Sequence, residues 1–285
     1  MSMVWLNGEI VAQSEAVVPV SDRGFLYGDS VFETIGVCCF RPFRLDRHLQ
    51  RLERSAGQVF LDLPMDRTGF EAAVQQTIRV NLFREGSVRV TVSRGSGGAE
   101  LMPADPPEPT VVVTVREPRD LSEARSQGVD IVVSEVPKNS PKALPITAKT
   151  GNYLNNILAQ RAARNEGAFE ALMVDNVGRI AEGTMTNVFM VTGGILYTPR
   201  LDGGVFPGIT REIVLELARE MEMEVLEEPF TSKELFTADE IWLTNSAIGI
   251  LPVRSLSGRR IFSPWPRYEK VAAAYWDMVE GECEG

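Results

Sequence analysis

The chain has 285 residues but only one histidine, His48, and three cysteines, Cys38, Cys39 and Cys283. One histidine excludes every metal site that needs two, and the cysteines lack the CxxC spacing of a structural zinc site. Three unpatterned cysteines favour a reducing compartment, so we expect a cytoplasmic protein without a metal. If the chain is an enzyme, we expect lysine, tyrosine or a carboxylate to carry its protons, and an organic cofactor is a candidate for stabilising charge on the substrate.

The sequence also lacks a basic excess and a long apolar run. There are 29 Lys and Arg against 39 Asp and Glu, a net charge of −10, which disfavours binding to a nucleic-acid backbone. No apolar run approaches the roughly 18–20 residues of a membrane helix, and residues 1–10 do not resemble a signal peptide. No GxSxG or GxxxxGK[ST] motif is present. With 44% hydrophobic and 24% charged residues, the composition is ordinary for a globular enzyme. From the charge and the missing apolar run we expect no nucleic-acid or membrane partner.

Hydrophobic periodicity and turn residues predict two α/β domains with mostly antiparallel or mixed sheets. The first domain covers residues 1–118, a linker with a short helix covers 119–128, and the second domain covers 129–285. We expect hairpins at 4–11, 171–181 and 187–198, and strands at 31–40, 87–93, 110–115, 129–136 and 241–244. Helices are expected at 45–56, 70–80 and 153–162, with a further helix capped by Thr210.

Lys149 lies between a loop with three prolines, residues 137–145, and an apolar helix. Partial desolvation at such a position favours the neutral amine, which is a nucleophile toward aldehydes. A solvated lysine at the end of a helix is the simpler alternative, because spacing alone does not identify a covalent site.

Glu182 follows a predicted strand among small and apolar residues. A carboxylate in such surroundings is unusual unless it has a partner. A pyridinium nitrogen is one suitable partner, because the two charges stabilise each other. The alternative is a structural ion pair with an arginine.

Several other residues fit an anion site. The helix that begins at Gly208–Arg211 offers backbone N–H groups and its dipole to a phosphate, although any capped helix does so. Ser246 follows a strand and would add a hydroxyl to the same anion. Arg51 would add positive charge, or it belongs to a solvated basic helix face. Arg89 alternates with valines, either as an exposed residue or as a carboxylate receptor.

Taken together, these segments resemble the class IV (fold type IV) pyridoxal-phosphate enzymes. This family includes branched-chain aminotransferases, D-amino acid aminotransferases and aminodeoxychorismate lyases. The matching segments follow the family order over nearly the whole chain: Asp22–Thr34, Arg47–Leu52, Lys149–Asn156, Ala181–Phe189, Tyr197–Pro199, Gly208–Arg211 and Ala238–Ser246.

The resemblance implies a two-domain α/β (α+β type) fold with mixed or antiparallel sheets and a C-terminal pseudo-barrel that binds pyridoxal 5′-phosphate. It also implies a homodimer with sites between the two domains, partly supplied by the neighbour. Amino acids and 2-oxo acids would be the substrates.

The resemblance also implies a role for each matching residue. Lys149 would hold the cofactor covalently and then move a proton between the substrate Cα and cofactor C4′. Glu182 would bind the pyridine N–H, and Tyr153 would contact the ring hydroxyl. The phosphate would be held by Arg51, the backbone at Ile209 and Thr210, and Ser246. The substrate side would be lined by Tyr27, Phe32 and Arg89, with the Ala247 N–H on the substrate carboxylate. His48 needs no catalytic role and is interpreted as a packing or surface residue.

Three departures bear on the substrate. Gly36 stands where branched-chain enzymes often have arginine, residues 96–101 replace the Arg and His of bacillus-type D-amino acid enzymes, and Ala99 replaces an arginine frequent in lyases. Our leading hypothesis is an aminotransferase for branched-chain or other hydrophobic amino acids. The alternatives are a lyase that splits aminodeoxychorismate to 4-aminobenzoate and pyruvate, a D-amino acid aminotransferase, and a binding or regulatory protein that has kept the fold.

Overall fold

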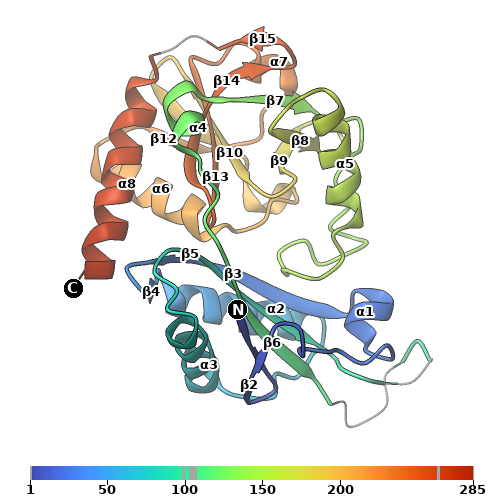
Figure 1. Cartoon of the computed structure of the whole chain (residues 1–285). Helices are drawn as coiled ribbons and strands as arrows, with labels where there is room; N and C mark the ends of the chain where they lie inside the picture. The colour runs from blue at the N-terminus through green and yellow to red at the C-terminus, as the bar shows by residue number, and fades with distance from the viewer. Residues whose placement is uncertain (1, 98–99, 103–107, 262–263, 285) are drawn as a thin grey trace. The chain divides into compact units, whose positions relative to one another are not determined.

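A computed structural model describes residues 2–97, 100–102, 108–261 and 264–284. The chain forms two compact units (Figure 1). Unit 1 contains Met1–Arg119, Ala148–Asn152 and Val279–Gly285, and unit 2 contains Asp120–Thr147 and Tyr153–Met278. The segment that carries Lys149 therefore belongs to unit 1, although the chain on both sides of it belongs to unit 2.

Unit 1 is an antiparallel sheet with the strand order β2-β1-β6-β5-β3-β4. Its elements are β1 (Met3–Leu6), β2 (Glu9–Ala12), α1 (Arg23–Tyr27), β3 (Ser30–Cys38), β4 (Arg41–Pro42), α2 (Leu45–Gln58), α3 (Arg67–Val80), β5 (Gly86–Ser93) and β6 (Thr110–Arg116). The first predicted hairpin is confirmed, because Asn7 and Gly8 both have positive φ, 47° and 100°, as a tight two-residue turn between strands requires.

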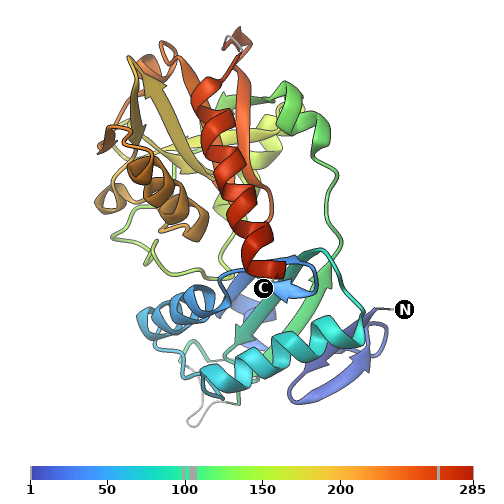
Figure 2. The same ribbon diagram turned by 90° about the vertical axis from the view of Figure 1, so that its left-hand side faces the viewer.

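The core of unit 1 lies between the sheet and the helices α2 and α3, which are seen from the side in Figure 2. Val88, Val90 and Val92 are fully buried against these helices, which confirms the half-buried strand predicted from their alternation. Arg89 and its alternate neighbours therefore point to the opposite face of the sheet. Leu49 and Leu52 supply the core side of α2, as their helical spacing predicts.

Unit 2 contains α4 (Ser122–Gln127), β7 (Val129–Val133), α5 (Leu154–Asn165), β8 (Glu170–Val174), β9 (Ile180–Gly183), β10 (Asn187–Thr192), β11 (Ile195–Thr198), the 3₁₀ helix η1 (Leu201–Gly203), α6 (Ile209–Glu220), β12 (Val225–Glu227), α7 (Ser232–Leu235), β13 (Glu240–Asn245), β14 (Gly249–Leu256), β15 (Arg259–Arg260) and α8 (Pro266–Glu284). The last turns of α8 belong to unit 1. Eight strands follow the order β12-β11-β10-β13-β14-β7-β8-β9, and β15 pairs with β14.

The sheet of unit 2 is mixed and strongly curled into a half-barrel, with α6 and α8 on one side and α5 on the other in Figure 1. The predicted fold class is therefore confirmed. The hairpins β8–β9 and β10–β11 also form as predicted. One local prediction is wrong: Thr210 does not cap α6, because Gly208 is the N-cap and Thr210 lies inside the first turn.

The described helices include none that is both long and apolar enough to cross a membrane. Within the same ranges, His, Cys, Asp and Glu side chains form no group of three or more that could hold a metal ion.

Candidate active site

Lys149 is held at an edge of the unit 1 sheet by backbone hydrogen bonds. The Phe32 N–H donates to Lys149 O (2.9 Å), and the Lys149 N–H donates to the Ser55 hydroxyl of α2 (3.1 Å). Two residues further along, the Gly151 N–H donates to Ser30 O (2.8 Å). A Cβ at Gly151 would lie 2.3 Å from the Ser30 Oγ and 3.1 Å from the Gly28 carbonyl oxygen, so a side chain here would force the serine hydroxyl to move. The lysine backbone is thus fixed without using its side chain.

Two cationic side chains lie over the ring of Phe32, which is itself buried. The Arg89 guanidinium carbon is 3.7 Å from the ring centroid, and the Lys149 Nζ is 4.6 Å from it. The Arg89 Nε also donates to Thr91 Oγ1 at 3.1 Å. Such cation–π contacts hold a charged group beside an apolar surface. Three of the predicted residues, Phe32, Arg89 and Lys149, are therefore adjacent.

Arg51 is buried in unit 1 and paired with Glu33 of β3, so the alternative of a solvated basic face is wrong. Its Nε and Nη2 donate to the two Glu33 carboxylate oxygens, each at 2.7 Å. His48 Nδ1 lies 2.7 Å from Glu33 Oε2. Burial alone raises the pKa of the Glu33 carboxyl, but the charge and hydrogen bonds of Arg51 and the bond to His48 lower that pKa to about 2. An ionised carboxylate only accepts, so the histidine nitrogen donates, and His48 is a buried structural residue.

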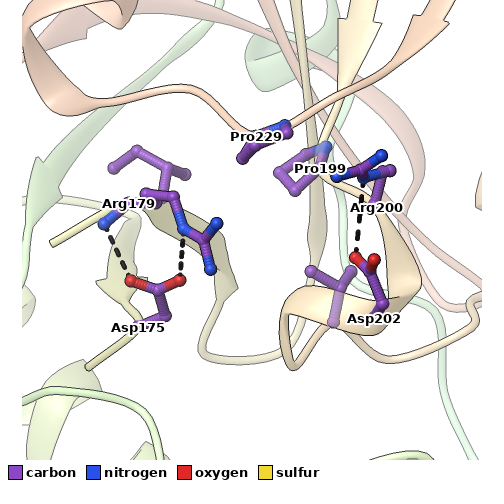
Figure 3. Close-up of a pocket in the computed structure, with 8 residues that line it drawn as sticks. Asp175, Arg179, Pro199, Arg200, Asp202 and Pro229 are labelled. Carbon is purple, nitrogen blue, oxygen red and sulfur yellow. Dashed lines mark hydrogen bonds and ion pairs between the residues drawn. The ribbon is translucent and has the colours of Figure 1, made fainter. Parts of the chain in front are cut away.

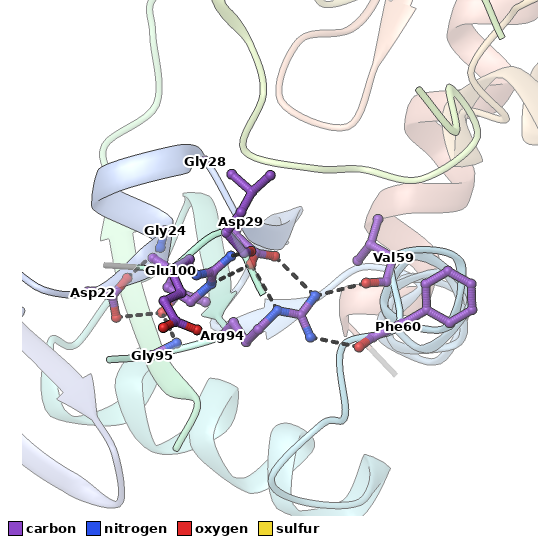
Figure 4. Close-up of polar contacts among 12 residues, drawn as sticks. Asp22, Gly24, Gly28, Asp29, Val59, Phe60, Arg94, Gly95 and Glu100 are labelled. Atoms are coloured by element: carbon purple, nitrogen blue, oxygen red, sulfur yellow. Dashed lines mark hydrogen bonds and ion pairs between the residues drawn. The ribbon is translucent and has the colours of Figure 1, made fainter. Parts of the chain in front are cut away.

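Tyr27 lies at the end of the short helix α1, with the Arg23 guanidinium carbon 5.0 Å from its ring centroid. A network of polar contacts beside α1 fixes this part of unit 1 (Figure 4). Asp22 caps α1 and accepts from one hydroxyl each of β5 and β6. Asp29 accepts from Arg23 (3.0 Å) and Arg94 (2.9 Å). Although burial opposes ionisation of Asp29, the two guanidinium groups lower its pKa overall. The network joins α1 to the strands that carry Phe32 and Arg89.

In unit 2, Glu182 lies on β9 and is nearly buried. Its Oε2 accepts from Asn187 Nδ2 (3.1 Å) and from the Phe206 N–H (2.8 Å). Its Oε1 is paired with Lys138 Nζ. The sequence alternative of an arginine partner is therefore wrong, because the partner cation is a lysine. With these three donors in place, an ionised carboxylate can also accept from a ring N–H.

The first turn of α6 is suited to an anion. Its N-cap, Gly208, has no side chain to bond the N–H groups of the first turn, which include those of Ile209 and Thr210. A Cβ at Gly208 would lie 2.0 Å from the Asn187 Oδ1, so a side chain here would displace the amide that holds Glu182. Thr244, opposite Asn187 in the β10–β13 register, has a buried hydroxyl with no hydrogen-bond partner among the described residues.

Three further predicted residues lie near element ends in unit 2. Tyr153 is the N-cap residue of α5, and Ser246 directly follows β13. The Ala247 N–H donates to Asn245 Oδ1 at 2.8 Å. These positions bring polar groups to chain turns, where binding residues commonly lie.

Glu170 supports the turn that follows Glu182. Its carboxylate accepts from the Thr184 and Thr186 hydroxyls (2.5 and 3.0 Å) and from the Met185 N–H (3.2 Å). Burial raises the pKa of Glu170 in spite of these donors. The sequence patterns give no role to Glu33, Lys138 or Glu170, although Glu33 lies in the matching segment Asp22–Thr34. A charged residue inside an apolar strand was the available signal for Glu33, since buried charges need partners.

The residues that line a pocket in unit 2 (Figure 3) include none of the predicted site residues. It is lined by Asp175, Arg179, Ile180, Pro199, Arg200, Asp202, Val205 and Pro229. Arg179 pairs with Asp175 at 2.7 Å and Arg200 with Asp202 at 3.6 Å. Each arginine already has an acidic partner, so the pocket gives no preference for an anion.

The donor and acceptor set fits pyridoxal phosphate. Glu182 is an acceptor for a ring N–H, α6 begins with backbone donors suited to a phosphate, and Lys149 is an amine fixed by its backbone. Gly98 and Ala99, which bear on the comparison with the lyases and the D-amino acid enzymes, lie outside the described residues.

A family model described as "Amino-transferase class IV" matches residues 30–256. A putative branched-chain-amino-acid aminotransferase of Methanocaldococcus jannaschii is 38% identical over 90% of this chain and 89% of its own. An aminodeoxychorismate lyase of Bacillus subtilis is 32% identical over 88% of this chain and 85% of its own. A D-alanine aminotransferase of Bacillus licheniformis is 30% identical over 98% of both chains.

Solved structures of branched-chain aminotransferases are also similar to this chain. The branched-chain amino acid aminotransferase of Escherichia coli has a TM-score of 0.94 at 31% identity, covering 97% of this chain and 94% of its own. The branched-chain aminotransferase of Thermoproteus uzoniensis, solved with norvaline, has a TM-score of 0.93 at 32% identity, covering 98% and 95%. The enzyme of Thermobaculum terrenum, solved in its PLP form, has a TM-score of 0.89 at 26% identity, covering 98% and 94%.

Proposed function

Because the chain belongs to the class IV aminotransferases, we propose that it uses pyridoxal phosphate to transfer an amino group between an amino acid and a 2-oxo acid. Branched-chain or other hydrophobic amino acids are the proposed donors. Relatives of that name match at 32–38% identity over nearly the full chain.

The observation that carries the proposal is the cluster of Lys149, Phe32 and Arg89. The lysine amine lies beside an aromatic ring, with a guanidinium over the same ring. An amine, an apolar surface and a carboxylate receptor are what a hydrophobic amino acid requires beside the reacting carbon.

Bound pyridoxal phosphate supplies an electron sink for negative charge at the substrate Cα. Lys149 Nζ would hold the cofactor and would carry the proton that leaves the substrate Cα. Glu182 accepts the ring N–H, and Tyr153 contacts the ring hydroxyl. Arg51, the N–H groups of Ile209 and Thr210, and the Ser246 hydroxyl bind the phosphate.

On the substrate side, Tyr27 and Phe32 are proposed to contact the side chain and Arg89 a carboxylate. The proposed role of the Ala247 N–H requires a substrate carboxylate to replace the Asn245 amide oxygen, because that oxygen accepts from the same N–H.

The test is a panel of L- and D-amino acids with 2-oxoglutarate or pyruvate as acceptor. We expect the highest kcat/KM with L-leucine, L-isoleucine or L-valine. A preference for D-alanine would instead assign the chain to the D-amino acid aminotransferases, and no transfer from any donor would contradict the proposal.

A lyase that splits aminodeoxychorismate is the second candidate. It is favoured by Gly36 on β3, where branched-chain enzymes often carry arginine, and by the Bacillus subtilis lyase at 32% identity. Pyruvate release from aminodeoxychorismate without a 2-oxo acid acceptor separates the two activities, because only the lyase reaction proceeds without an acceptor.

A homodimer is also proposed. Leu154, Ile157 and Leu158 form an apolar stripe on α5 with 68%, 58% and 49% of each residue exposed, while the small Ala159 and Ala163 pack inward. Exposed apolar stripes of this kind commonly mark surfaces that become buried between subunits. Ile157→Lys should shift the molecular mass in solution toward that of one chain.

The free cysteines support the proposed cytoplasmic location.

A further inference from the structure

Lys138 is the cation that faces Glu182. The exposed fractions of the two side chains are 11% and 9%, so both ends of this ion pair are largely removed from water. The other carboxylate oxygen is already held by Asn187 and by the Phe206 N–H, and Asn187 also donates to Phe206 O at 2.9 Å. Glu182 is therefore fixed in orientation by three different donors.

The backbone around Lys138 is held on both sides. The Lys138 N–H donates to Val174 O at the end of β8 (2.9 Å). Asn155 of α5 donates through Nδ2 to Pro137 O (2.9 Å) and accepts through Oδ1 from the Asn139 N–H (3.1 Å). A long, flexible lysine side chain thus starts from a fixed backbone, which lowers the entropic cost of keeping its ammonium group on the carboxylate.

Lys138 supplies the opposite charge beside the Glu182 carboxylate. Burial of a carboxylate favours its neutral form, whereas an opposite charge within hydrogen-bond distance favours the ionised form. The distinction matters because an ionised carboxylate accepts hydrogen bonds, while a protonated one also carries an O–H donor. A carboxylate has roughly four lone-pair positions, so these three donors leave about one for a ring N–H.

We propose that Lys138 is a positioning residue for the cofactor, which keeps Glu182 ionised and aimed to accept the N–H of the pyridine ring. The inference rests on the cofactor in the proposed function and not on the choice of substrate. Lys138 acts through Glu182 and does not contact the substrate.

Titration of the cofactor-free protein with pyridoxal phosphate tests this role, with tryptophan fluorescence as the readout. Lys138→Met keeps the length of the side chain and removes its charge, and should raise the Kd by about tenfold or more. Lys138→Arg should restore most of the affinity, because the cation is kept. Lys142→Met is the matched control, since Lys142 is exposed on the same loop, and should leave the Kd unchanged.

A double-mutant cycle tests whether Lys138 affects cofactor affinity through Glu182. If Lys138 acts through Glu182, adding Lys138→Met to Glu182→Gln should cause little further loss of affinity. Enzyme saturated with cofactor should show a lower kcat in Lys138→Met with little change in KM for the amino acid.

Three results would overturn the inference: an unchanged Kd in Lys138→Met, a loss in Lys138→Arg as large as in Lys138→Met, or full additivity in the cycle. Circular dichroism of each cofactor-free variant checks the fold, and the arginine variant decides the question if the methionine variant is unfolded. If the unmodified protein does not bind pyridoxal phosphate at all, the proposed function itself fails. Normal binding with no effect of Lys138→Met rejects only the role of Lys138.

Discussion

Arg51 and Glu33 form a buried ion pair in which two guanidinium nitrogens each lie 2.7 Å from a separate carboxylate oxygen. The pair joins α2 to β3, and His48, also on α2, forms a further hydrogen bond to Glu33. This geometry fixes the plane of the guanidinium. Glu33 therefore orients the arginine that we propose for the phosphate.

Glu33→Gln should destabilise unit 1 strongly, because it leaves a buried guanidinium without its counter-ion. We expect the free energy of unfolding in denaturant to fall by about 3–5 kcal/mol. The matched control is Glu53→Gln, which breaks the exposed pair between α2 and Arg67 and should have a much smaller effect. Equal effects of the two substitutions would contradict the structural role of Glu33.

The same carboxyl predicts a pH dependence. The pKa of Glu33 in the folded chain is lowered from its ordinary 4.5 to about 2. Its contribution to stability is therefore complete above about pH 4.5 and is lost as the pH falls toward 2, with a size on the order of 3 kcal/mol. The difference in unfolding free energy between the unmodified chain and Glu33→Gln should narrow over that range. A difference that stays constant with pH would show that Glu33 is not the titrating group.

Arg89→Gln should raise KM for the amino acid by about tenfold or more, with a smaller change in kcat, if Arg89 binds a substrate carboxylate. Thr91→Val should cause a weaker form of the same defect, because Thr91 Oγ1 accepts from Arg89 Nε. Steady-state kinetics with L-leucine and 2-oxoglutarate gives both constants. An unchanged KM in Arg89→Gln would leave Arg89 only a packing role against Phe32.

Gly208→Ala should weaken cofactor binding, because its new Cβ would meet the Asn187 amide that holds Glu182. Gly57→Ala is the control: Gly57 lies inside α2 with open space where the alanine methyl group would lie, so alanine should stabilise the chain by about 0.5–1 kcal/mol. Cofactor affinity and melting temperature distinguish the two substitutions. Cofactor affinity unchanged in Gly208→Ala would show that the Asn187 side chain adapts without disturbing Glu182.

Local sequence patterns predicted the elements whose side chains have one clear period. The valines of β5 and the leucines of α2 are examples, because burial on one face imposes the period. The pattern did not predict β14, since Pro252 interrupts a strand that nevertheless pairs on both sides. Thr210 was assigned to the wrong helix position because glycine also serves as an N-cap.

The roles of the motif residues could be predicted from the resemblance to a family. The residues that support them could be identified only from the structure. Lys138 and Glu182 are 44 residues apart in the chain, and no short-range pattern relates them. Glu33 and Arg51 are likewise joined by the packing of a helix on a sheet. Long-range polar pairs of this kind depend on tertiary structure, which periodicity does not encode.

The most direct measurement is reduction of the pyridoxal phosphate-loaded protein with borohydride, followed by peptide mass spectrometry. The account predicts one pyridoxyl group, on Lys149. It also predicts that Lys149→Ala loses this group, the visible absorbance of the bound cofactor and turnover. The variant should keep its fold, because the backbone hydrogen bonds of residue 149 do not use its side chain. A pyridoxyl group on Lys138 or Lys142 instead, or full activity in Lys149→Ala, would contradict it.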